Sequence, residues 1–252
     1  MEAVFRTDVG KIRSHNEDDG FISEQLNGQM LVLVADGMGG HQAGDVASKM
    51  TKDILLEKWQ EINRPLNPKE AEKWLEDSIY EVNRRLFEHA QKHPQCKGMG
   101  TTLVASICTD QFISHAHVGD SRIYLKSEGQ MKQITSDHSL VAELVRSGQI
   151  SEEEAQNHPR RNVVLRALGT ESNIKVDVNT INWDPGALLM LCSDGLTDML
   201  PEEEIYEQIT DEGKLEKLAE QLIQMANDRG GEDNITIALI RHTGDLKEVT
   251  DR

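Results

Sequence analysis

Two apolar segments of this chain each run directly into an Asp-Gly pair. Residues 30–37 read Met-Leu-Val-Leu-Val-Ala-Asp-Gly, and residues 187–195 read Ala-Leu-Leu-Met-Leu-Cys-Ser-Asp-Gly. Continuous apolar runs of this length that end in turn residues are typical of buried strands. We therefore predict that Asp36 and Asp194 lie at strand ends. There a rigid sheet can hold a carboxylate, and the following glycine lets the backbone approach a ligand.

Composition limits the class of protein. The 252 residues are 37% hydrophobic and 28% charged, which is typical of a soluble globular protein of one large or two small domains. No apolar run approaches the roughly 20 residues that span a bilayer, and the N-terminal residues show no signal-peptide pattern. Three scattered cysteines fit a reducing compartment, so we expect a cytoplasmic protein with no membrane partner. The net charge of −17 disfavours nucleic acid as a partner.

Periodicity predicts the secondary structure. Helices are expected over about residues 44–61, over 67–93 with Asn67 as N-cap and Pro68 in the first turn, and over 201–209 and 214–228. A polar, helix-forming insert covers about 139–160, with Ser151 and Glu154 spaced as a capping box. Strands are expected at residues 4–8, 30–36, 101–108, 112–119, 121–126, 131–135, 174–181, 187–193 and 234–241. The charged stretch between the first two strands is expected to be a loop.

Grouped antiparallel strands with helices between the groups indicate an α+β fold in which two sheets pack together with helices outside. The sequence contains no Pro/Gly/Ser-rich linker and no low-complexity tract. We therefore expect residues 1–242 to form a single domain, followed by a charged tail over 243–252.

More acidic residues accompany the two Asp-Gly pairs. Asp120 and Asp233 adjoin predicted strands, and Arg13, Glu17 and Asp18 lie in the charged N-terminal stretch. Carboxylate and carbonyl oxygens are the ligands that Mg²⁺ and Mn²⁺ prefer. Two such metals about 3.5–4 Å apart can lower the pKa of a shared water for attack on phosphorus, while an arginine clamps the phosphoryl oxygens. A single Asp-Gly pair is more often a simple turn, but four acids at strand ends favour metal chemistry.

The same residues carry a family resemblance that spans nearly the whole chain. The chain resembles the bacterial type 2C protein phosphatases, which are metal-dependent protein phosphatases (the PPM family) of PrpC type. No single segment is specific to this family, but the whole set of segments in this order is. The matching segments are Arg13-Ser-His-Asn-Glu-Asp18, Val34-Ala-Asp-Gly-Met-Gly-Gly-His41, Gly98-Met-Gly-Thr-Thr102, His117-Val-Gly-Asp-Ser-Arg122, Asp137-His-Ser139, His158-Pro159, Leu191-Cys-Ser-Asp-Gly-Leu-Thr-Asp198 and Gly231-Glu-Asp-Asn-Ile-Thr236.

The resemblance implies a four-layer α-β-β-α sandwich of two central antiparallel sheets flanked by helices, with two Mn²⁺ or Mg²⁺ ions at the sheet edge. It also implies a mobile flap over about residues 139–169 and a role for each acidic position. Asp36 would bridge both metals, and Gly37 would offer its carbonyl. Asp194 and Asp233 would complete one coordination sphere, whereas Glu17 and Asp18 would act through bound water. A third, weaker metal would be held by Asp120, Asp194 and Asp198. Arg13 would bind the substrate phosphate.

One position departs from the family pattern. Animal members carry histidine directly after the bridging Asp-Gly, as a proposed acid for the leaving group, whereas this chain has Met38. His41 is the replacement that we predict, because a leaving alkoxide needs an acid whose pKa is near the working pH. A loop histidine bonded to backbone, or a metal-bound water as the acid, stays an open alternative.

These observations predict a protein serine/threonine phosphatase in which a hydroxide bridging two divalent metals attacks the phosphomonoester. The resemblance implies phosphorylated protein substrates and a cognate eukaryotic-type Ser/Thr kinase that the enzyme opposes, and we expect a monomer. No cysteine is followed by arginine at the sixth position, and no Gly-x₄-Gly-Lys-Ser/Thr loop is present. The alternatives are an inactive phosphoprotein-binding pseudophosphatase, a phosphatase of small phosphate esters, or one of a dedicated anti-sigma-type regulator.

Overall fold

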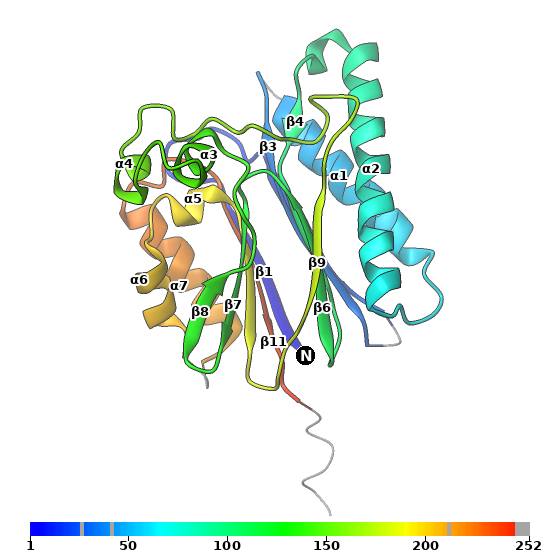
Figure 1. The fold of residues 1–252 in the computed structure, drawn as a ribbon, viewed down its shortest axis with the longest axis vertical. Helices are drawn as coiled ribbons and strands as arrows, with labels where there is room; N and C mark the ends of the chain where they lie inside the picture. Colours follow the sequence, from blue (N-terminus) through cyan, green and yellow to red (C-terminus); the bar gives the residue numbers. More distant parts are fainter. Residues whose placement is uncertain (26–27, 41–42, 211–212, 245–252) are drawn as a thin grey trace, which may run out of the picture.

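Two antiparallel sheets pack face to face in the middle of the molecule, and helices cover both outer faces (Figure 1). The structure is a computed structural model that describes residues 1–25, 28–40, 43–210 and 213–244. One sheet has the strand order β1-β11-β10-β7-β8, and the other has the order β2-β3-β5-β6-β9 with β4 paired to β3. The predicted α+β four-layer sandwich is confirmed.

The strands of the first sheet are β1 (Glu2–Asp8), β7 (Arg122–Ser127), β8 (Gln130–Gln133), β10 (Leu188–Cys192) and β11 (Ile235–Arg241). Those of the second are β2 (Asp18–Glu24), β3 (Met30–Met38), β4 (Gly100–Thr101), β5 (Leu103–Cys108), β6 (Phe112–Val118) and β9 (Asp177–Asn182). The helices are α1 (Ala43–Gln60), α2 (Pro68–Lys92), the 3₁₀ turn η1 (Pro94–Cys96), α3 (Leu140–Arg146), α4 (Glu152–Gln156), α5 (Asp194–Thr197), α6 (Glu202–Gln208) and α7 (Leu215–Asp228).

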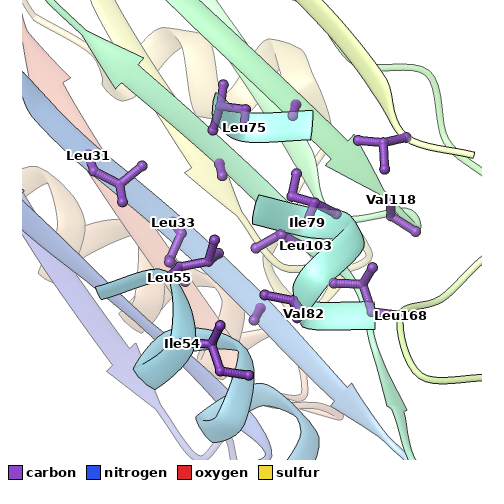
Figure 2. Packing of buried hydrophobic residues seen from close by; sticks show 14 of the residues in the cluster. Leu31, Leu33, Ile54, Leu55, Leu75, Ile79, Val82, Leu103, Val118 and Leu168 are labelled. Carbon is purple, nitrogen blue, oxygen red and sulfur yellow. The ribbon is translucent and has the colours of Figure 1, made fainter. Parts of the chain in front are cut away.

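Three apolar layers hold the sandwich together. The largest lies between the second sheet and helices α1 and α2, and Figure 2 shows Leu33 of β3 beside Leu55 of α1, and Ile79 of α2 beside Leu103 of β5. A second layer joins the first sheet to α6 and α7, and a third fills the space between the sheets. The alternation of side chains along each strand lets one strand serve two layers. Leu33 faces the helices, whereas Val32 and Val34 face the other sheet.

Helix α2 begins where the sequence predicts. Asn67 Oδ1 accepts from the Glu70 N–H at 3.1 Å, the Glu70 carboxylate accepts from the Asn67 N–H at 3.0 Å, and Pro68 occupies the first turn. This capping box satisfies backbone N–H groups that lack partners within the helix. The box predicted at Ser151 and Glu154 also forms, at the start of α4. The predicted helix-forming insert contains two short helices, α3 and α4.

Two elements differ from the prediction. The charged stretch expected to be a loop contains strand β2, which pairs along its whole length with β3 and places Asp18 opposite Asp36. Residues 194–197, directly after the second apolar strand, form the one-turn helix α5. Among the helices that the structure describes, none combines the length and apolar character needed to cross a bilayer.

Candidate active site

Five aspartates gather at one end of the sandwich, where strands from both sheets begin or end. Asp18 opens β2, Asp36 lies near the end of β3, and Asp120 lies in the turn between β6 and β7. Asp194 follows β10 as the first residue of α5, and Asp233 precedes β11. The carboxyl groups of Asp18 and Asp194 lie close enough to that of Asp36 for a hydrogen bond when one of the pair is protonated. Residues 215 positions apart in the sequence thus meet at one place.

The concentration of negative charge changes the acidity of the cluster. Burial, followed by the charges of Asp18, Asp194, Asp120 and Asp233, raises the pKa of Asp36 well above its usual range. Burial is also the first cause for Asp194, and here the charges of Asp120 and Asp198 add to the rise in its pKa. Like charges at short range without a cation disfavour the ionised form. A cluster in this state favours binding of a cation, which would reverse these shifts.

Asp36 is held by its backbone rather than through its carboxylate. Its N–H donates to Thr102 Oγ1 at 3.1 Å, and its carbonyl accepts from the Thr102 N–H and the Thr101 hydroxyl, each at 2.8 Å. These bonds fix the backbone at Asp36, so its carboxyl is held in position beside those of Asp18 and Asp194. Gly37 follows in a tight place, since a Cβ there would lie 2.2 Å from the Gly44 carbonyl oxygen. Only glycine fits this close approach of β3 to the start of α1.

Asp18 connects the two sheets. Ser193, in the other sheet's β10–α5 junction, donates its hydroxyl to Asp18 Oδ2 at 2.8 Å, and the same Oγ accepts from the Thr236 N–H at 3.0 Å. Asp18 is 8% exposed, and its burial raises its pKa to about 6. The carboxyl of Asp18 is thus held by a hydroxyl donor from the opposite sheet.

Asn234 attaches the N-terminal loop to the site. Its Oδ1 accepts from the Glu17 N–H at 2.7 Å, and its Nδ2 donates to the carbonyls of Val9 and His15 at 2.9 and 3.1 Å. The neighbouring Asp233 binds Arg13, whose Nη2 lies 2.6 Å from Asp233 Oδ2. Arg13 is half-exposed, so its guanidinium lies at the rim of the acidic cluster.

The predicted residues differ in how close to this centre they lie. Glu17 is at its edge, because its carbonyl accepts from the Gly37 N–H at 3.1 Å and its carboxylate bonds to His15. Asp120 is 8% exposed, and burial raises its pKa to about 6. Asp198 caps the C-terminus of α5 and is exposed, although its charge still acts on Asp194 and Asp120. His41 lies outside the described residues, and Met38 at the end of β3 is half-buried.

The donor set fits a hard divalent cation. The side chains that act on Asp36 and Asp194 are all aspartates, so the cluster presents carboxylate oxygens. Asp194 Oδ1 is buried and has no hydrogen-bond partner among the described residues, which is costly unless a ligand binds it. Oxygen-only ligands of this kind suit Mg²⁺ or Mn²⁺ rather than zinc.

Three supporting residues were not predicted from the sequence. Thr102, Ser193 and Asn234 each hold an element of the cluster through the hydrogen bonds given above. All three stand in segments that carry the family resemblance, and Ser193 and Asn234 also lie next to Asp194 and Asp233 in the sequence. That adjacency is the signal that was available.

Comparison with known proteins agrees with this geometry. The profile of the protein phosphatase 2C family matches residues 11–239. The chain belongs to the protein phosphatase 2C family. Serine/threonine phosphatase stp of Listeria innocua is 49% identical over 240 residues, which are 95% of each chain.

Solved structures of family members share the fold. Serine/threonine phosphatase Stp1 from Staphylococcus aureus superposes with a TM-score of 0.91 at 40% identity, covering 96% of this chain and 95% of that one. The catalytic domain of protein phosphatase PstP in complex with two manganese ions superposes with a TM-score of 0.83 at 32% identity, covering 94% and 96%. The predicted family, the phosphatase reaction class and the use of Mn²⁺ or Mg²⁺ by this protein phosphatase 2C chain are therefore confirmed.

Proposed function

We propose that this protein is a Mn²⁺- or Mg²⁺-dependent phosphatase that removes phosphate from phosphoserine and phosphothreonine of proteins. Its similarity to Listeria and Staphylococcus serine/threonine phosphatases supports this substrate class. A kinase of the eukaryotic type would supply the phosphorylated proteins. The strongly negative net charge argues for protein rather than nucleic-acid partners. We further propose that the enzyme acts in the cytoplasm and as a monomer.

The acidic cluster would hold the metals. Asp36, which both Asp18 and Asp194 approach, is the residue we assign to bridging, with Gly37, Asp194 and Asp233 completing the inner set. Glu17 and Asp18 would act through bound water, and Asp120, Asp194 and Asp198 would hold a third ion. Two such ions supply a hydroxide for in-line attack on phosphorus without a covalent phosphoenzyme.

The other residues would bind the substrate and position the ligands. Arg13, at the rim and half-exposed, would exchange its bond to Asp233 for a bidentate contact with the phosphoryl oxygens. Ser193 would keep the Asp18 carboxylate in place from the opposite sheet, and Asn234 would hold the backbone at Glu17. His41, three residues beyond Met38, is our candidate for the acid that protonates the serine or threonine leaving oxygen.

The observation that carries the proposal is the convergence of five aspartates from both sheets, where burial raises the pKa values of Asp36 and Asp194 and the charges of neighbouring aspartates add to the rise. The direct test is hydrolysis of a phosphothreonine peptide with Mn²⁺ and with EDTA. We expect Mn²⁺-dependent release of phosphate that EDTA stops, and we expect Asp36→Asn to abolish it. Asp184→Asn is the matched control, since Asp184 is exposed on the β9–β10 connection. Activity that survives chelation, or persists in Asp36→Asn, would contradict the proposal.

A metal-loaded wild type that binds phosphopeptides without hydrolysing them would instead support a binding protein. A panel that includes p-nitrophenyl phosphate separates protein substrates from small esters by kcat/KM. We further propose that residues 1–242 act as one catalytic domain and that residues 139–169 form its flap. Limited proteolysis with and without Mn²⁺ tests that division.

A further inference from the structure

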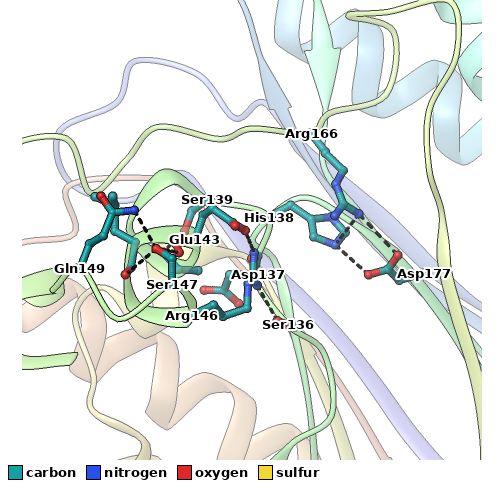
Figure 3. A network of polar contacts seen from close by, with 12 residues as sticks. Ser136, Asp137, His138, Ser139, Glu143, Arg146, Ser147, Gln149, Arg166 and Asp177 are labelled. Carbon is teal, nitrogen blue, oxygen red and sulfur yellow. Dashed lines mark hydrogen bonds and ion pairs between the residues drawn. The ribbon is translucent and has the colours of Figure 1, made fainter. Parts of the chain in front are cut away.

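The loop that leads from β8 into the flap is tied down at four consecutive residues. The Ser136 backbone bonds to His117 Nε2, with its carbonyl at 2.9 Å. Asp137 accepts from Arg122 Nε and Nη2 at 3.0 and 2.7 Å. Ser139 caps α3. Figure 3 shows His138 between this loop and a pair formed by Arg166 and Asp177.

His138 holds both polar groups of the Gly119 backbone. Its N–H donates to the Gly119 carbonyl at 2.9 Å, and its Nδ1 accepts from the Gly119 N–H at 3.1 Å. Gly119 immediately precedes Asp120 and has φ +109, and a Cβ there would lie 2.6 Å from Thr102 Cβ. The turn that carries Asp120 is therefore packed against Thr102 on one side and bound by His138 on the other. Thr102 is also the residue that bonds to the backbone of Asp36.

The imidazole is itself oriented from two other elements. Because Nδ1 accepts from Gly119, the proton of the neutral ring lies on Nε2, which donates to Asp177 Oδ2 of β9 at 3.1 Å. Burial lowers the pKa of His138 to about 4, which agrees with a neutral ring. Arg166 Nη1 lies 3.4 Å from Asp177 Oδ1, so a residue near the end of the flap joins the same group.

Both ends of the flap meet at His138. Residue Ser139 pairs with Val164 in an isolated bridge, and the Leu165 N–H donates to the His138 carbonyl at 2.7 Å. The flap thus begins next to His138, the residue that binds Gly119, and its residues 164–165 return to the same place. The base of the flap and the turn that carries Asp120 are therefore bonded to the same residue, His138.

His117, His138 and Asp177 are also a group of three possible metal ligands, with ligand atoms within 4.8 Å of one another. Their geometry argues against a metal. The two rings are stacked, with centroids 4.6 Å apart and planes 18° from parallel, so their in-plane lone pairs do not converge on one point. Arg166 Nη1 lies 3.0 Å from His138 Nε2, where it would repel a cation. The arrangement is instead a polar clamp, in which Asp177 orients the ring of His138 and His138 binds the backbone of Gly119.

We propose that His138, oriented by Asp177, is a positioning residue that fixes the Gly119–Asp120 turn and so couples the flap to metal binding at Asp120. The inference rests on the proposed function, because it concerns the same metal centre. Residues that orient ligands from outside the coordination sphere typically contribute 10–100-fold in metal affinity. The clamp is expected to act in that way, through the position of Asp120 rather than through contact with substrate.

Isosteric variants separate the two bonds of the ring. In His138→Asn the amide Oδ1 takes the place of Nδ1 and can accept from Gly119. In His138→Gln the amide is one bond further out and reaches toward Asp177 instead. His242 is the control, because it is also buried, accepts a glycine N–H (Gly244, 3.0 Å) at Nδ1 and bonds to a carbonyl through Nε2. His242 follows the C-terminal end of β11, whereas Asp233 precedes the N-terminal end of the same strand.

The test titrates Mn²⁺ calorimetrically into each variant and into Asp120→Ala, which identifies the binding step that depends on Asp120. We expect His138→Ala and His138→Gln to weaken that step by about tenfold or more. His138→Asn should stay within about threefold of wild type, and His242→Ala should leave the step unchanged. In the Asp120→Ala background, His138→Ala should cause no further loss, since both changes act on one interaction. If His138→Ala does not fold, the Asn and Gln pair decides.

Hydrogen exchange gives a readout independent of turnover. The Gly119 amide and peptides from residues 139–169 should exchange faster in His138→Gln than in His138→Asn, and added Mn²⁺ should slow the flap peptides only where the clamp is intact. Equal Mn²⁺ affinity and exchange in wild type, His138→Asn and His138→Gln would overturn the inference. Absence of phosphatase activity in wild type would refute the proposed function alone, because these two measurements do not use the reaction.

Discussion

At the scale of single residues, the centre is defined by carboxylates that are less acidic than usual. Burial is the main cause of the raised pKa values of Asp18 and Asp120, both about 6, compared with an ordinary value of 3.8. A raised folded-state pKa contributes stability that is complete below the unfolded value and is lost as pH rises through the folded value. The metal-free protein therefore loses the contribution of Asp18 and Asp120 between about pH 4 and pH 6.

Metal binding should accordingly depend on pH. Mn²⁺ must displace the protons that the cluster holds, so we expect its affinity to fall by about tenfold or more from pH 7 to pH 5, with proton release on binding. Calorimetry in two buffers of different ionisation enthalpy measures both quantities. Overall stability is a poorer readout, because buried His138, with its pKa lowered to about 4, contributes stability that is lost as pH falls. An affinity that is constant over this range would contradict the interpretation.

Arg13 tests the substrate side of the site. If its guanidinium binds the phosphoryl group in the ground state, Arg13→Ala should raise KM for a phosphothreonine peptide about tenfold at saturating Mn²⁺, with a smaller change in kcat. Lys11→Ala is the control, since Lys11 lies in the same loop with similar exposure and pairs with Asp228. A loss confined to kcat would assign Arg13 to the transition state instead.

At the scale of elements, the sequence predicts the strands better than the residues that support the site. Apolar runs identify β3 and β10, and their Asp-Gly ends locate Asp36 and Asp194. Strand β2 could not be predicted, because its sequence Asp-Asp-Gly-Phe-Ile-Ser-Glu has little strand propensity and pairs with β3 only in the tertiary fold. Helix α5 has four residues, too few for a periodic pattern.

The supporting residues were missed for a related reason. Ser193 and Asn234 are ordinary turn residues in sequence, and only the packed sheets place the Ser193 hydroxyl against Asp18 and the Asn234 amide among Val9, His15 and Glu17. The aspartates could be predicted as site residues because several acidic residues at strand ends repel one another unless a cation binds them. A neutral side chain at a turn carries no such signal.

Asn234 offers a prediction at this scale, because it joins the N-terminal loop to the start of β11. Asn234→Ala leaves one N–H and two carbonyls without partners, so the free energy of unfolding in EDTA should fall by about 1–3 kcal/mol. Urea denaturation measures this. Asn63→Ala, at an exposed asparagine, should change it by less than about 0.5 kcal/mol. Equal stability of the two variants would show that the loop is not held by this amide.

At the scale of the whole molecule, the acidic cluster lies across the sandwich rather than within one sheet. Asp18 and Asp36 come from the second sheet, Asp194 and Asp233 border strands of the first, and Asp120 lies where the chain passes between them. The apolar layer between the sheets brings the strand ends together, but the aspartates repel one another there. Cations at this end would remove that repulsion and connect the two sheets.

Divalent metal should therefore stabilise the global fold. At a free Mn²⁺ concentration 100 times Kd, binding to the folded state adds about 2.7 kcal/mol per site, or roughly 5–10 °C in Tm for a chain of this size. Differential scanning calorimetry with Mn²⁺ and with EDTA measures the shift. Asp36→Asn should lose most of it, because repulsion around the cluster falls and the bridging ligand is gone, whereas Asp184→Asn should retain it. Because the ligands border both sheets, the shift should move one cooperative transition that includes both. Two separate transitions, only one of which responds to Mn²⁺, would mean that the centre belongs to a single sheet.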